Sequence, residues 1–331
     1  MNQLQPKFNT GLVIGKFYPP HRGHKFLINT ALAQCKSVTV ILCYKRTETI
    51  SGFLRAEWLK RIHPSLNVIV IDDYLLEDDD SEGWAKFTIE TLGYVPDAVF
   101  TSEDYGDPYA KFMGSTHVLV DKLRVNIPIS ATQIRSNPLG YFNYLEPVVK
   151  SFYAKRICII GAESTGTTTL SQDLAKHYKT VWVPEYGRVY SEGKLYTENS
   201  SNWYEHEFAN IAQAQNVLEN SLAEQSSGLV ICDTNAYATA IWHERYLQSR
   251  SEFVEQHSTN NNHVLYIVTK DDIPFIQDGV RDGEHLRHWM HERIIERLEE
   301  DHKKYIVVSG TREQRLNQAI LAINRTATVN W

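Results

Sequence analysis

The sequence predicts an α/β protein of two domains, each built around a parallel β-sheet. Three observations carry this prediction. The chain has 331 residues, which is long for one domain and ordinary for two. Short apolar runs alternate with amphipathic helical segments along it. A strand, a glycine-containing turn and a helix follow one another twice, beginning at Gly11 and at Arg156. We therefore predict domains at residues 1–153 and 154–331, with the boundary near Tyr153–Lys155.

The first domain is expected to alternate strands and helices. Its strands are short apolar runs, and its helices carry apolar residues at intervals of three and four. The predicted strands are Gly11–Ile14, Val38–Tyr44, Val68–Ile71, Ala98–Thr101 and the strand-like run Val125–Ile129, and the predicted helices are His24–Gln34, Leu54–Ile62 and Trp84–Leu92. Because helical segments separate these strands, the sheet is expected to be parallel.

The second domain repeats the pattern from Arg156 onward. Five apolar runs have the length and branched-residue content of buried strands. The predicted strands are Arg156–Ile160, Val181–Val183, Leu229–Cys232, Val264–Val268 and Ile306–Val308, and the predicted helices are about Thr169–Tyr178, Tyr204–Glu224, His285–Leu298 and Glu313–Asn324. This order again predicts a parallel sheet with helices on its faces.

Composition and charge exclude several classes of partner. Hydrophobic residues make up 42% and charged residues 22%, as in soluble globular proteins. The formal net charge is −6, and residues 1–150 hold 16 basic and 16 acidic residues, so neither half predicts a nucleic-acid-binding surface. No apolar run approaches the roughly 20 residues that span a bilayer, and the N-terminus lacks a signal-peptide pattern. We expect neither nucleic-acid nor membrane binding.

The four cysteines indicate a reducing compartment. Cys43 and Cys158 lie inside predicted strands, Cys232 ends one, and Cys35 lies near a helix end. No pair or His/Cys group has the spacing of a redox motif or a metal site. Buried free thiols and a cytoplasmic protein are therefore expected.

A turn with two histidines follows the first strand. Residues Gly15–His24 read GKFYPPHRGH and lead from a strand into a helix, where free backbone N–H groups and the helix dipole favour an anion. His21 and His24 are three residues apart, and Gly23 lets a ligand approach the backbone. Imidazole N–H groups at this point can stabilise charge on a phosphate. The alternative is a loop with two ordinary histidines.

A second segment, Ile129–Arg135, has the sequence ISATQIR. Ser130 and Thr132 suit a helix N-terminus, and Arg135 would project from the first turn as a guanidinium for phosphate. Standing alone, the segment would be interpreted as a capped helix with a surface arginine.

Together the two segments resemble the nucleotidylyltransferase superfamily, whose motifs are an HxGH-type sequence after the first strand and a later ISxTxxR sequence. The similarity is greatest to the nicotinamide mononucleotide (NMN) adenylyltransferase domain of the NadR-like family, and extends to Arg55–Leu59 (RAEWL) and Thr101–Gly106 (TSEDYG). The resemblance implies a domain with a Rossmann-like sheet. This domain would transfer AMP from ATP to NMN, giving NAD and pyrophosphate, with Mg²⁺ on the departing pyrophosphate. Because the NMN phosphate is already an anion, positioning and charge stabilisation suffice without a protein base.

The resemblance also implies site residues. His21, His24 and Arg135 would be catalytic, and Arg55 and Trp58 would bind nicotinamide, with the Trp58 ring stacked on it. A tryptophan in the helical core is the alternative for Trp58. The full set expected to bind ATP and its phosphates is Gly15, Lys16, Phe17, His21, His24, Ser130, Thr132 and Arg135.

The second domain carries an incomplete P-loop. The turn after its first strand has the P-loop glycine spacing and a final Ser/Thr for Mg²⁺, but Thr167 occupies the place of the lysine. Its residues are Gly161, Glu163, Ser164, Thr165, Gly166, Thr167 and Thr168. Asp233 ends an apolar strand as a Walker B-like carboxylate would. Arg281 and Arg287 belong to a segment that could close over phosphates as a lid, or form a solvated surface turn.

These features, in this order, resemble the ribosylnicotinamide kinase domain of the same family, so the resemblance extends from about Gly11 to Asn324. It implies a domain with a P-loop kinase-like sheet, which phosphorylates ribosylnicotinamide to NMN. Asp233 would take the proton of the ribose hydroxyl, with Thr168 and Asp233 on Mg²⁺. Glu185 and Arg188, from an E-Y-x-R segment, would lie near the nucleoside, and Arg281 and Arg287 would neutralise the transferring phosphoryl group.

Thr167 leaves alternatives open. The favoured one is an active kinase in which lid arginines replace the lysine. The others are a domain that only binds nucleotide, as the sensor of a monofunctional adenylyltransferase, and a structural remnant. A further hypothesis is a pantetheine-phosphate or other adenylyl- or cytidylyltransferase joined to an unrelated kinase.

The expected partners are ATP, NMN, ribosylnicotinamide and NAD, and a homo-oligomer is compatible with them. Members of this family that repress transcription carry an N-terminal helix-turn-helix domain. Because only about ten residues precede the first predicted strand, no such domain and no DNA binding are expected.

Overall fold

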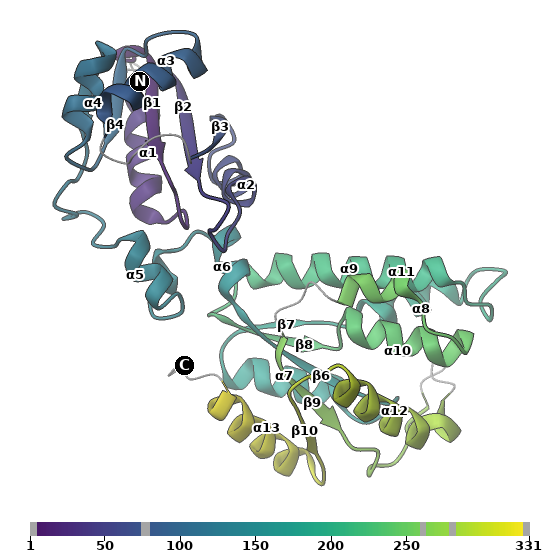
Figure 1. The fold of residues 1–331 in the computed structure, drawn as a ribbon. Helices are drawn as coiled ribbons and strands as arrows, with labels where there is room; N and C mark the ends of the chain where they lie inside the picture. Colours follow the sequence, from purple (N-terminus) through teal and green to yellow (C-terminus); the bar gives the residue numbers. More distant parts are fainter. Residues whose placement is uncertain (1–4, 74–79, 259–262, 278–282, 327–331) are drawn as a thin grey trace. The chain divides into compact units, whose positions relative to one another are not determined.

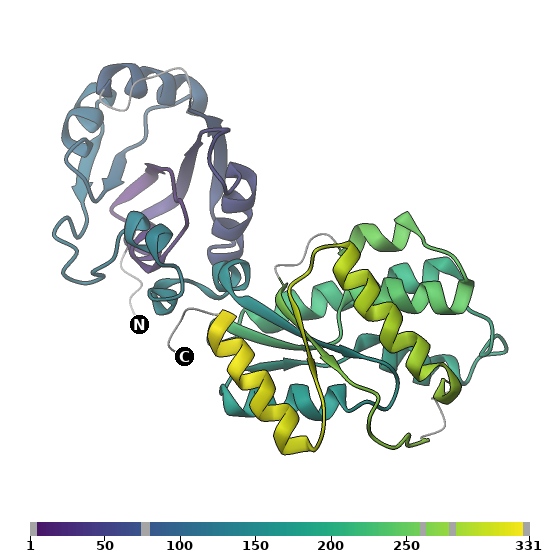
Figure 2. The ribbon, with the colours of Figure 1, turned by 60° about the horizontal axis from the view of Figure 1, so that its bottom comes forward.

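The computed structural model describes residues 5–73, 80–258, 263–277 and 283–326. By its internal contacts the chain divides into two units, Met1–Val149 and Lys150–Trp331, each described by itself (Figure 1 and Figure 2). Each unit has a five-stranded sheet whose paired strands are all parallel. The predicted α/β class, with one parallel sheet in each part of the chain, is confirmed.

The first sheet has the strand order β3-β2-β1-β4-β5. Its strands are β1 Phe8–Gly15, β2 Cys35–Tyr44, β3 Asn67–Asp72, β4 Ala98–Thr101 and β5 Thr116–Leu119, and its helices are α1 Arg22–Gln34, α2 Gly52–Ile62, α3 Ser81–Leu92, α4 Gly106–Met113 and α5 Ala131–Ser136. A 3₁₀ turn, η1 Phe142–Tyr144, and α6 Pro147–Tyr153 follow. The order of strands reverses between β1 and β4, which is where ligands bind in open α/β sheets.

Side chains of β1 alternate between two cores in this unit. Val13 packs on one face of the sheet with Ile28 of α1 and Leu59 of α2. Leu12 packs on the opposite face with Ala85 of α3 and Ala110 of α4. Because successive strand residues point to opposite faces, helices cover both sides and the strand ends carry the polar groups.

The predicted strand Val125–Ile129 is wrong. These residues form a loop, because the Asp121 carboxylate accepts hydrogen bonds from the backbone N–H groups of Val125, Asn126 and Ile127. The fifth strand is instead the short β5, which follows the unpredicted helix α4.

The second sheet has the order β10-β9-β6-β8-β7. Its strands are β6 Lys155–Gly161, β7 Val181–Val183, β8 Leu229–Asp233, β9 His263–Thr269 and β10 Tyr305–Val308, and its helices are α7 Thr167–His177, α8 Tyr186–Lys194, α9 Glu205–Ala223, α10 Ala236–Leu247, α11 Glu252–Glu255, α12 Arg287–Glu300 and α13 Arg312–Thr326, with 3₁₀ turns η2 Gln256–Ser258 and η3 Glu284–Leu286. Helices α7 and α13 pack on one core of the sheet, and α10 and α12 on the other. The carboxyl ends of β6, β7 and β8 meet at one edge, where the predicted phosphate loop begins.

All four cysteines are buried and free, as predicted. Within the described residues, no helix is both long enough and apolar enough to cross a membrane.

Candidate active sites

Both predicted histidines lie where the turn after β1 enters α1. His21 is the N-cap of α1, and its Nδ1 accepts a hydrogen bond from the Gly23 backbone N–H at 3.1 Å. The rings of His21 and His24 stack with their centroids 3.7 Å apart. A Cβ atom at Gly23 would lie 2.9 Å from the His21 ring, so glycine permits this close packing. Both imidazoles therefore lie together at a helix N-terminus.

Both imidazoles are neutral at pH 7 in the free protein. Burial, aided by the charge of Arg124, lowers the pKa of His21 to about 3. Burial, and then His21 and Arg124, lower the pKa of His24 well below its usual value. Within the described structure, the buried Nδ1 atom of His24 has no hydrogen-bond partner. His21 therefore carries its proton on Nε2, where it can be donated, while His24, which is hydrogen-bonded to the Pro19 backbone, keeps its Nδ1 for a ligand.

Arg135 joins the two sequence motifs. One guanidinium nitrogen donates to the Tyr18 carbonyl at 2.6 Å and the other to the Thr132 hydroxyl at 3.0 Å. The guanidinium also lies 4.8 Å from the centre of the Tyr18 ring. Ser130 caps α5 in a capping box with Gln133. Segments more than 100 residues apart therefore meet, as the paired motifs predicted.

Two adjoining cavities flank this pair of segments. The first has a volume of about 430 Å³, the second about 170 Å³, and both are lined by His24, Leu27, Ser102 and Glu103. The larger one also contains the predicted residues Gly15, Lys16 and Phe17, and the smaller one His21, Ser130 and Thr132. His24 thus lies where a ligand in one cavity would meet a ligand in the other.

Arg55 and Trp58 lie outside both cavities. Arg55 is fully buried and donates to the Lys16 carbonyl at 2.6 Å and to Glu48 at 2.5 Å, so it holds the phosphate turn from behind. Trp58 is 4% exposed. The tryptophan that lines the larger cavity is Trp84 of α3. Sequence reasoning missed it, although a residue in the first helical turn after a parallel strand lies at the edge where α/β ligands bind.

Acidic side chains also line the larger cavity. Asp73 follows β3 and is buried, with its carboxylate 4.0 Å from the ammonium group of Lys16. Glu103 follows β4 and is exposed. The cavity therefore combines aromatic rings, Trp84 among them, with carboxylates, a set that suits a flat cationic ring.

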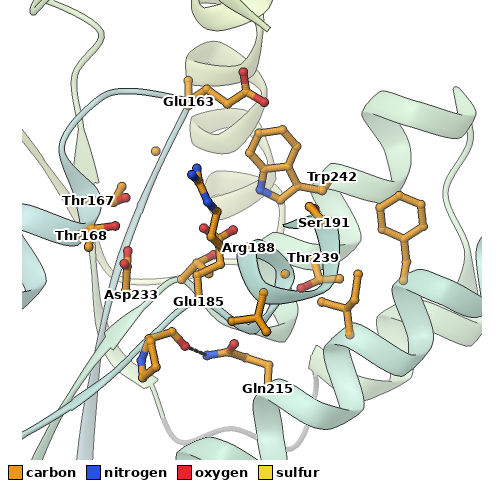
Figure 3. A pocket seen from close by; sticks show the side chains of 18 of the residues that line it. Glu163, Thr167, Thr168, Glu185, Arg188, Ser191, Gln215, Asp233, Thr239 and Trp242 are labelled. Carbon is orange, nitrogen blue, oxygen red and sulfur yellow. Dashed lines mark hydrogen bonds between the residues drawn. The ribbon is translucent and has the colours of Figure 1, made fainter. Parts of the chain in front are cut away.

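The second unit has a cavity of about 460 Å³ over the phosphate loop (Figure 3). Ser164 and Gly166 have left-handed backbones, with φ of 58° and 85°. Such residues are typical of backbone nests that bind anions. The predicted loop residues Gly161, Glu163, Ser164, Thr167 and Thr168 line the cavity, together with Glu185, Arg188 and Asp233. Thr165 is buried behind the loop, where its hydroxyl donates to the Ala162 carbonyl at 2.7 Å.

Two arginines hold this loop through its carbonyl groups. The buried Arg315 of α13 donates to the Thr165 carbonyl at 2.6 Å. Arg287 donates to the Ser164 carbonyl at 3.4 Å and to the Ile273 carbonyl at 2.9 Å. Arg287, expected in the lid, thus supports the loop, and it does not line the cavity. Arg281 lies outside the described residues. Sequence reasoning missed Arg315, because nothing near α13 indicates its partner about 150 residues earlier.

Asp233 faces the P-loop at the carboxyl end of β8. Its carboxylate accepts hydrogen bonds from the hydroxyl groups of Thr168 and Thr167, which partly oppose the effect of burial. Burial raises the pKa of Asp233 to about 6. Thr167, in the place of the lysine, therefore contacts the Walker B-like carboxylate.

Aromatic rings line the other end of this cavity. Trp203 lies 5.1 Å from Phe208 and 5.3 Å from Tyr246, measured between ring centroids, and Trp242 lines the same region. Such a cluster is suited to a flat, cationic ring. No local pattern in the sequence marks these residues, since the packing of α9 against α10 brings them together only in the fold.

Comparison with known proteins accounts for both units. A family model described as an AAA domain matches residues 156–315. NadR of Escherichia coli (strain K12), described as a trifunctional NAD biosynthesis/regulator protein, is 28% identical over 326 residues, which cover 91% of this chain and 79% of the relative. NadR of Salmonella typhimurium is also 28% identical, over 91% of this chain and 78% of the relative. The chain is homologous to NadR.

Solved structures of NadR show the same fold. A crystal structure of NadR in complex with NR aligns with a TM-score of 0.77 at 22% identity, covering 98% of this chain and 97% of the other. A structure of NadR in complex with NAD and AMP-PNP gives a TM-score of 0.76 at 22% identity over the same shares. The cavities of both units therefore belong to a fold shared with NadR, and the P-loop turn forms here without its lysine.

Proposed function

We propose that the chain makes NAD in two steps, phosphorylating ribosylnicotinamide to NMN and then transferring AMP from ATP to NMN. One observation carries this proposal: a single chain homologous to NadR holds both a histidine–arginine phosphate site and a P-loop site with facing carboxylates. The NadR relatives are described as NAD biosynthesis proteins, and NadR structures hold NR, NAD and AMP-PNP. With four buried free thiols and ATP as a substrate, we propose the cytoplasm as its compartment.

In adenylyl transfer, an oxygen of the NMN phosphate attacks the α-phosphorus of ATP. The bond from that phosphorus to the α–β bridging oxygen breaks, and pyrophosphate leaves. His24, between the two cavities, would donate an N–H to the oxygens of the α-phosphate, assisted by His21. Arg135 and Lys16 would place positive charge beside the triphosphate, and Ser130 and Thr132 would line the ATP side.

The larger cavity of the first unit is our candidate for the NMN site. Trp84 would stack on the nicotinamide ring, in place of Trp58, because Trp84 lines that cavity and Trp58 is buried outside it. The nicotinamide ring of NMN is a pyridinium cation, which an aromatic face and the carboxylates of Asp73 and Glu103 would attract. Arg55 would act by holding the Lys16 carbonyl.

In the kinase step, the 5′-hydroxyl oxygen of ribosylnicotinamide attacks the γ-phosphorus of ATP. The bond from that phosphorus to the β–γ bridging oxygen breaks, and ADP leaves. The aromatic cluster around Trp203 and Trp242 would hold the nicotinamide ring at the far end of the cavity. The hydroxyl proton needs an acceptor. Three carboxylates line this cavity, and because Glu163 pairs with Arg245, we consider Asp233 and Glu185 for this role.

The contacts of Asp233 favour dividing the work between these carboxylates. Its carboxylate is hydrogen-bonded to Thr168, and an adjacent hydroxyl and carboxylate are the oxygen ligands that Mg²⁺ prefers. When bound, Mg²⁺ would offset the negative charge of the triphosphate. We therefore propose that Asp233 and Thr168 hold the metal, and that Glu185, rather than Asp233, accepts the proton.

Product analysis tests the function directly. The purified chain is incubated with Mg-ATP and either ribosylnicotinamide or NMN, and NMN, NAD, ADP and pyrophosphate are measured. The proposal predicts NAD from both substrates. His24→Ala should stop the reaction at NMN, whereas Asp233→Asn should block only the reaction that starts from ribosylnicotinamide. NAD from NMN alone would reduce the second unit to a sensor or remnant, and NAD from neither would overturn the nicotinamide assignment.

A further inference from the structure

Because Thr167 stands in the place of the P-loop lysine, the cavity of the second unit lacks a positive charge that a P-loop normally supplies. In a P-loop, the lysine at this position reaches the β- and γ-phosphates of the nucleotide. Here Thr167 turns its hydroxyl to Asp233 instead. The cavity is also lined by Glu163, Glu185 and Asp233, which would repel the triphosphate. An active kinase therefore needs a cation from elsewhere in the fold.

Three arginines near the loop are already committed to the protein. Arg315 donates to the Thr165 and Lys270 carbonyls and pairs with Asp272. Arg287 donates to two carbonyls, one of them in the loop. Arg245 is buried and pairs with Glu163 at 3.0 Å. Moving any of them onto a phosphate would release the backbone or the carboxylate that it now holds.

Arg188 differs from these three arginines because it lines the cavity itself. Among the described residues that line the cavity, it is the only arginine or lysine. Figure 3 shows its side chain extending into the cavity, between Thr167 on one side and Trp242 on the other. Its Nε donates to Glu192 at 2.6 Å, one helical turn along α8, in a pair that is partly exposed. Exposed pairs of this kind are weak, so the pair with Glu192 does not keep the guanidinium from binding a phosphate.

We propose that Arg188 replaces the P-loop lysine as the cation for the β- and γ-phosphates of ATP. A guanidinium offers a planar fork of donors that binds two phosphate oxygens at once. Reaching in from α8, opposite the loop, it would neutralise charge on the transferring group while ADP leaves. This inference rests on the proposed kinase activity, and it assigns to Arg188 the role first expected of the lid arginines.

A double-mutant cycle between positions 188 and 167 tests the replacement. The four full-length proteins are the wild type, Arg188→Gln, Thr167→Lys and the double variant, with Arg325→Gln as a control that removes an exposed arginine of the same unit. The rate of ADP and NMN formation from ribosylnicotinamide is measured for each. Adenylyl transfer from ATP to NMN, measured on the same preparations, reports that the chain is folded.

The expected pattern is specific to a replaced lysine. Arg188→Gln should lower kcat for phosphorylation by about 10²–10³-fold, the effect of losing one charge-stabilising group. Thr167→Lys should raise the rate of the Arg188→Gln variant by at least about tenfold over Arg188→Gln alone, because it returns a cation to the loop. Restoration of this kind would not occur if Arg188 had a structural role.

Three results would overturn the proposal. The first is an Arg188→Gln variant that phosphorylates ribosylnicotinamide as fast as the Arg325→Gln control. The second is a loss of this activity in Arg188→Gln that Thr167→Lys does not restore. The third is a loss of this activity in Arg281→Gln and not in Arg188→Gln. If the wild type does not phosphorylate ribosylnicotinamide, the proposed kinase activity is wrong. The role of Arg188 is then tested by measuring the binding of AMP-PNP to proteins that also carry His24→Ala. There, Arg188→Gln should weaken binding at the second site by about tenfold or more and Thr167→Lys should restore it; unchanged binding would refute the role of Arg188.

Discussion

The phosphate turns of the two units occupy the same place in their sheets and supply charge by different means. Each connects the first strand of a parallel sheet to a helix N-terminus. In the first unit, His21 caps the helix that follows the turn, His24 lies in its first helical turn, and Arg135 of α5 binds the backbone of the phosphate turn. In the second unit, the turn supplies hydroxyl groups, and arginines from distant helices hold its carbonyls.

The difference follows from the nucleophile that each reaction requires. An NMN phosphate is already an anion, so the first site needs donors for the α-phosphate and no base. An alcohol must lose its proton, and accordingly carboxylates, among them Glu185 and Asp233, line the cavity of the second unit. Carboxylates close to a triphosphate raise the need for positive charge, which makes the absence of the P-loop lysine more consequential there.

Removing the His24 side chain should separate the two activities most clearly. His24→Ala should lower adenylyl transfer by about 10²–10³-fold, because the donor between the two cavities is lost. Phosphorylation of ribosylnicotinamide should continue, since it uses the other unit. Both rates are measured by chromatography of the products. His177→Ala, which removes an exposed histidine of α7, is the control; adenylyl transfer by His24→Ala at the rate of this control would contradict the role of the imidazole.

The roles of Glu185 and Asp233 in the cavity of the second unit should be separable by mutation. Glu185→Gln should lower kcat for phosphorylation by about 10²-fold, with an unchanged Mg²⁺ requirement, because it removes a proton acceptor. Asp233→Asn should instead raise the Mg²⁺ concentration for half-maximal rate by about tenfold or more. Rates are measured across a Mg²⁺ titration, with the exposed Glu313→Gln as control. If the two variants shift the titration equally, the division of roles is wrong.

Acid should affect the two activities differently. The pKa of Asp233 is raised to about 6 by burial, so its carboxylate is ionised at pH 7 and becomes protonated as the pH falls through 6. Because the ionised form is the one that would hold Mg²⁺, kcat/KM for the kinase step should fall about tenfold between pH 7 and pH 5. The pKa of His21 is about 3, so adenylyl transfer should not share this transition. Parallel pH profiles of kcat/KM on one preparation check this, and a common midpoint would argue against it.

The smallest expected effect distinguishes two tryptophans. Trp84→Ala should raise KM for NMN about fivefold, since a cation–π contact is lost, while the free energy of unfolding changes little. Trp58→Ala should lower the free energy of unfolding of the first unit by about 3–5 kcal/mol, as for other buried aromatic residues. Steady-state kinetics and urea unfolding are measured on both variants. A specific rise in KM with Trp58→Ala alone would restore the original assignment of Trp58.

Much of the fold could be predicted from local patterns. The strands Ala98–Thr101 and Val181–Val183 match the predictions at both ends. Ala98–Thr101 is fully buried, and an apolar run buried on both sides of a parallel sheet has a strong local signal. Val125–Ile129 has a similar pattern, but the Asp121 carboxylate captures its backbone N–H groups. A side chain outside the run therefore decided against a strand.

The sequence by itself determined the two phosphate turns, since glycine spacing, helix capping and the residue types of a turn act within about ten residues. It also showed that position 167 lacks the lysine. Only the tertiary structure decided which distant side chains complete each site. Trp84 rather than Trp58 lines a cavity, Arg315 holds the loop that Arg188 faces, and Arg287 turns to the backbone. These outcomes depend on how helices pack on the sheet, and contacts between residues far apart in the chain leave no local pattern to read.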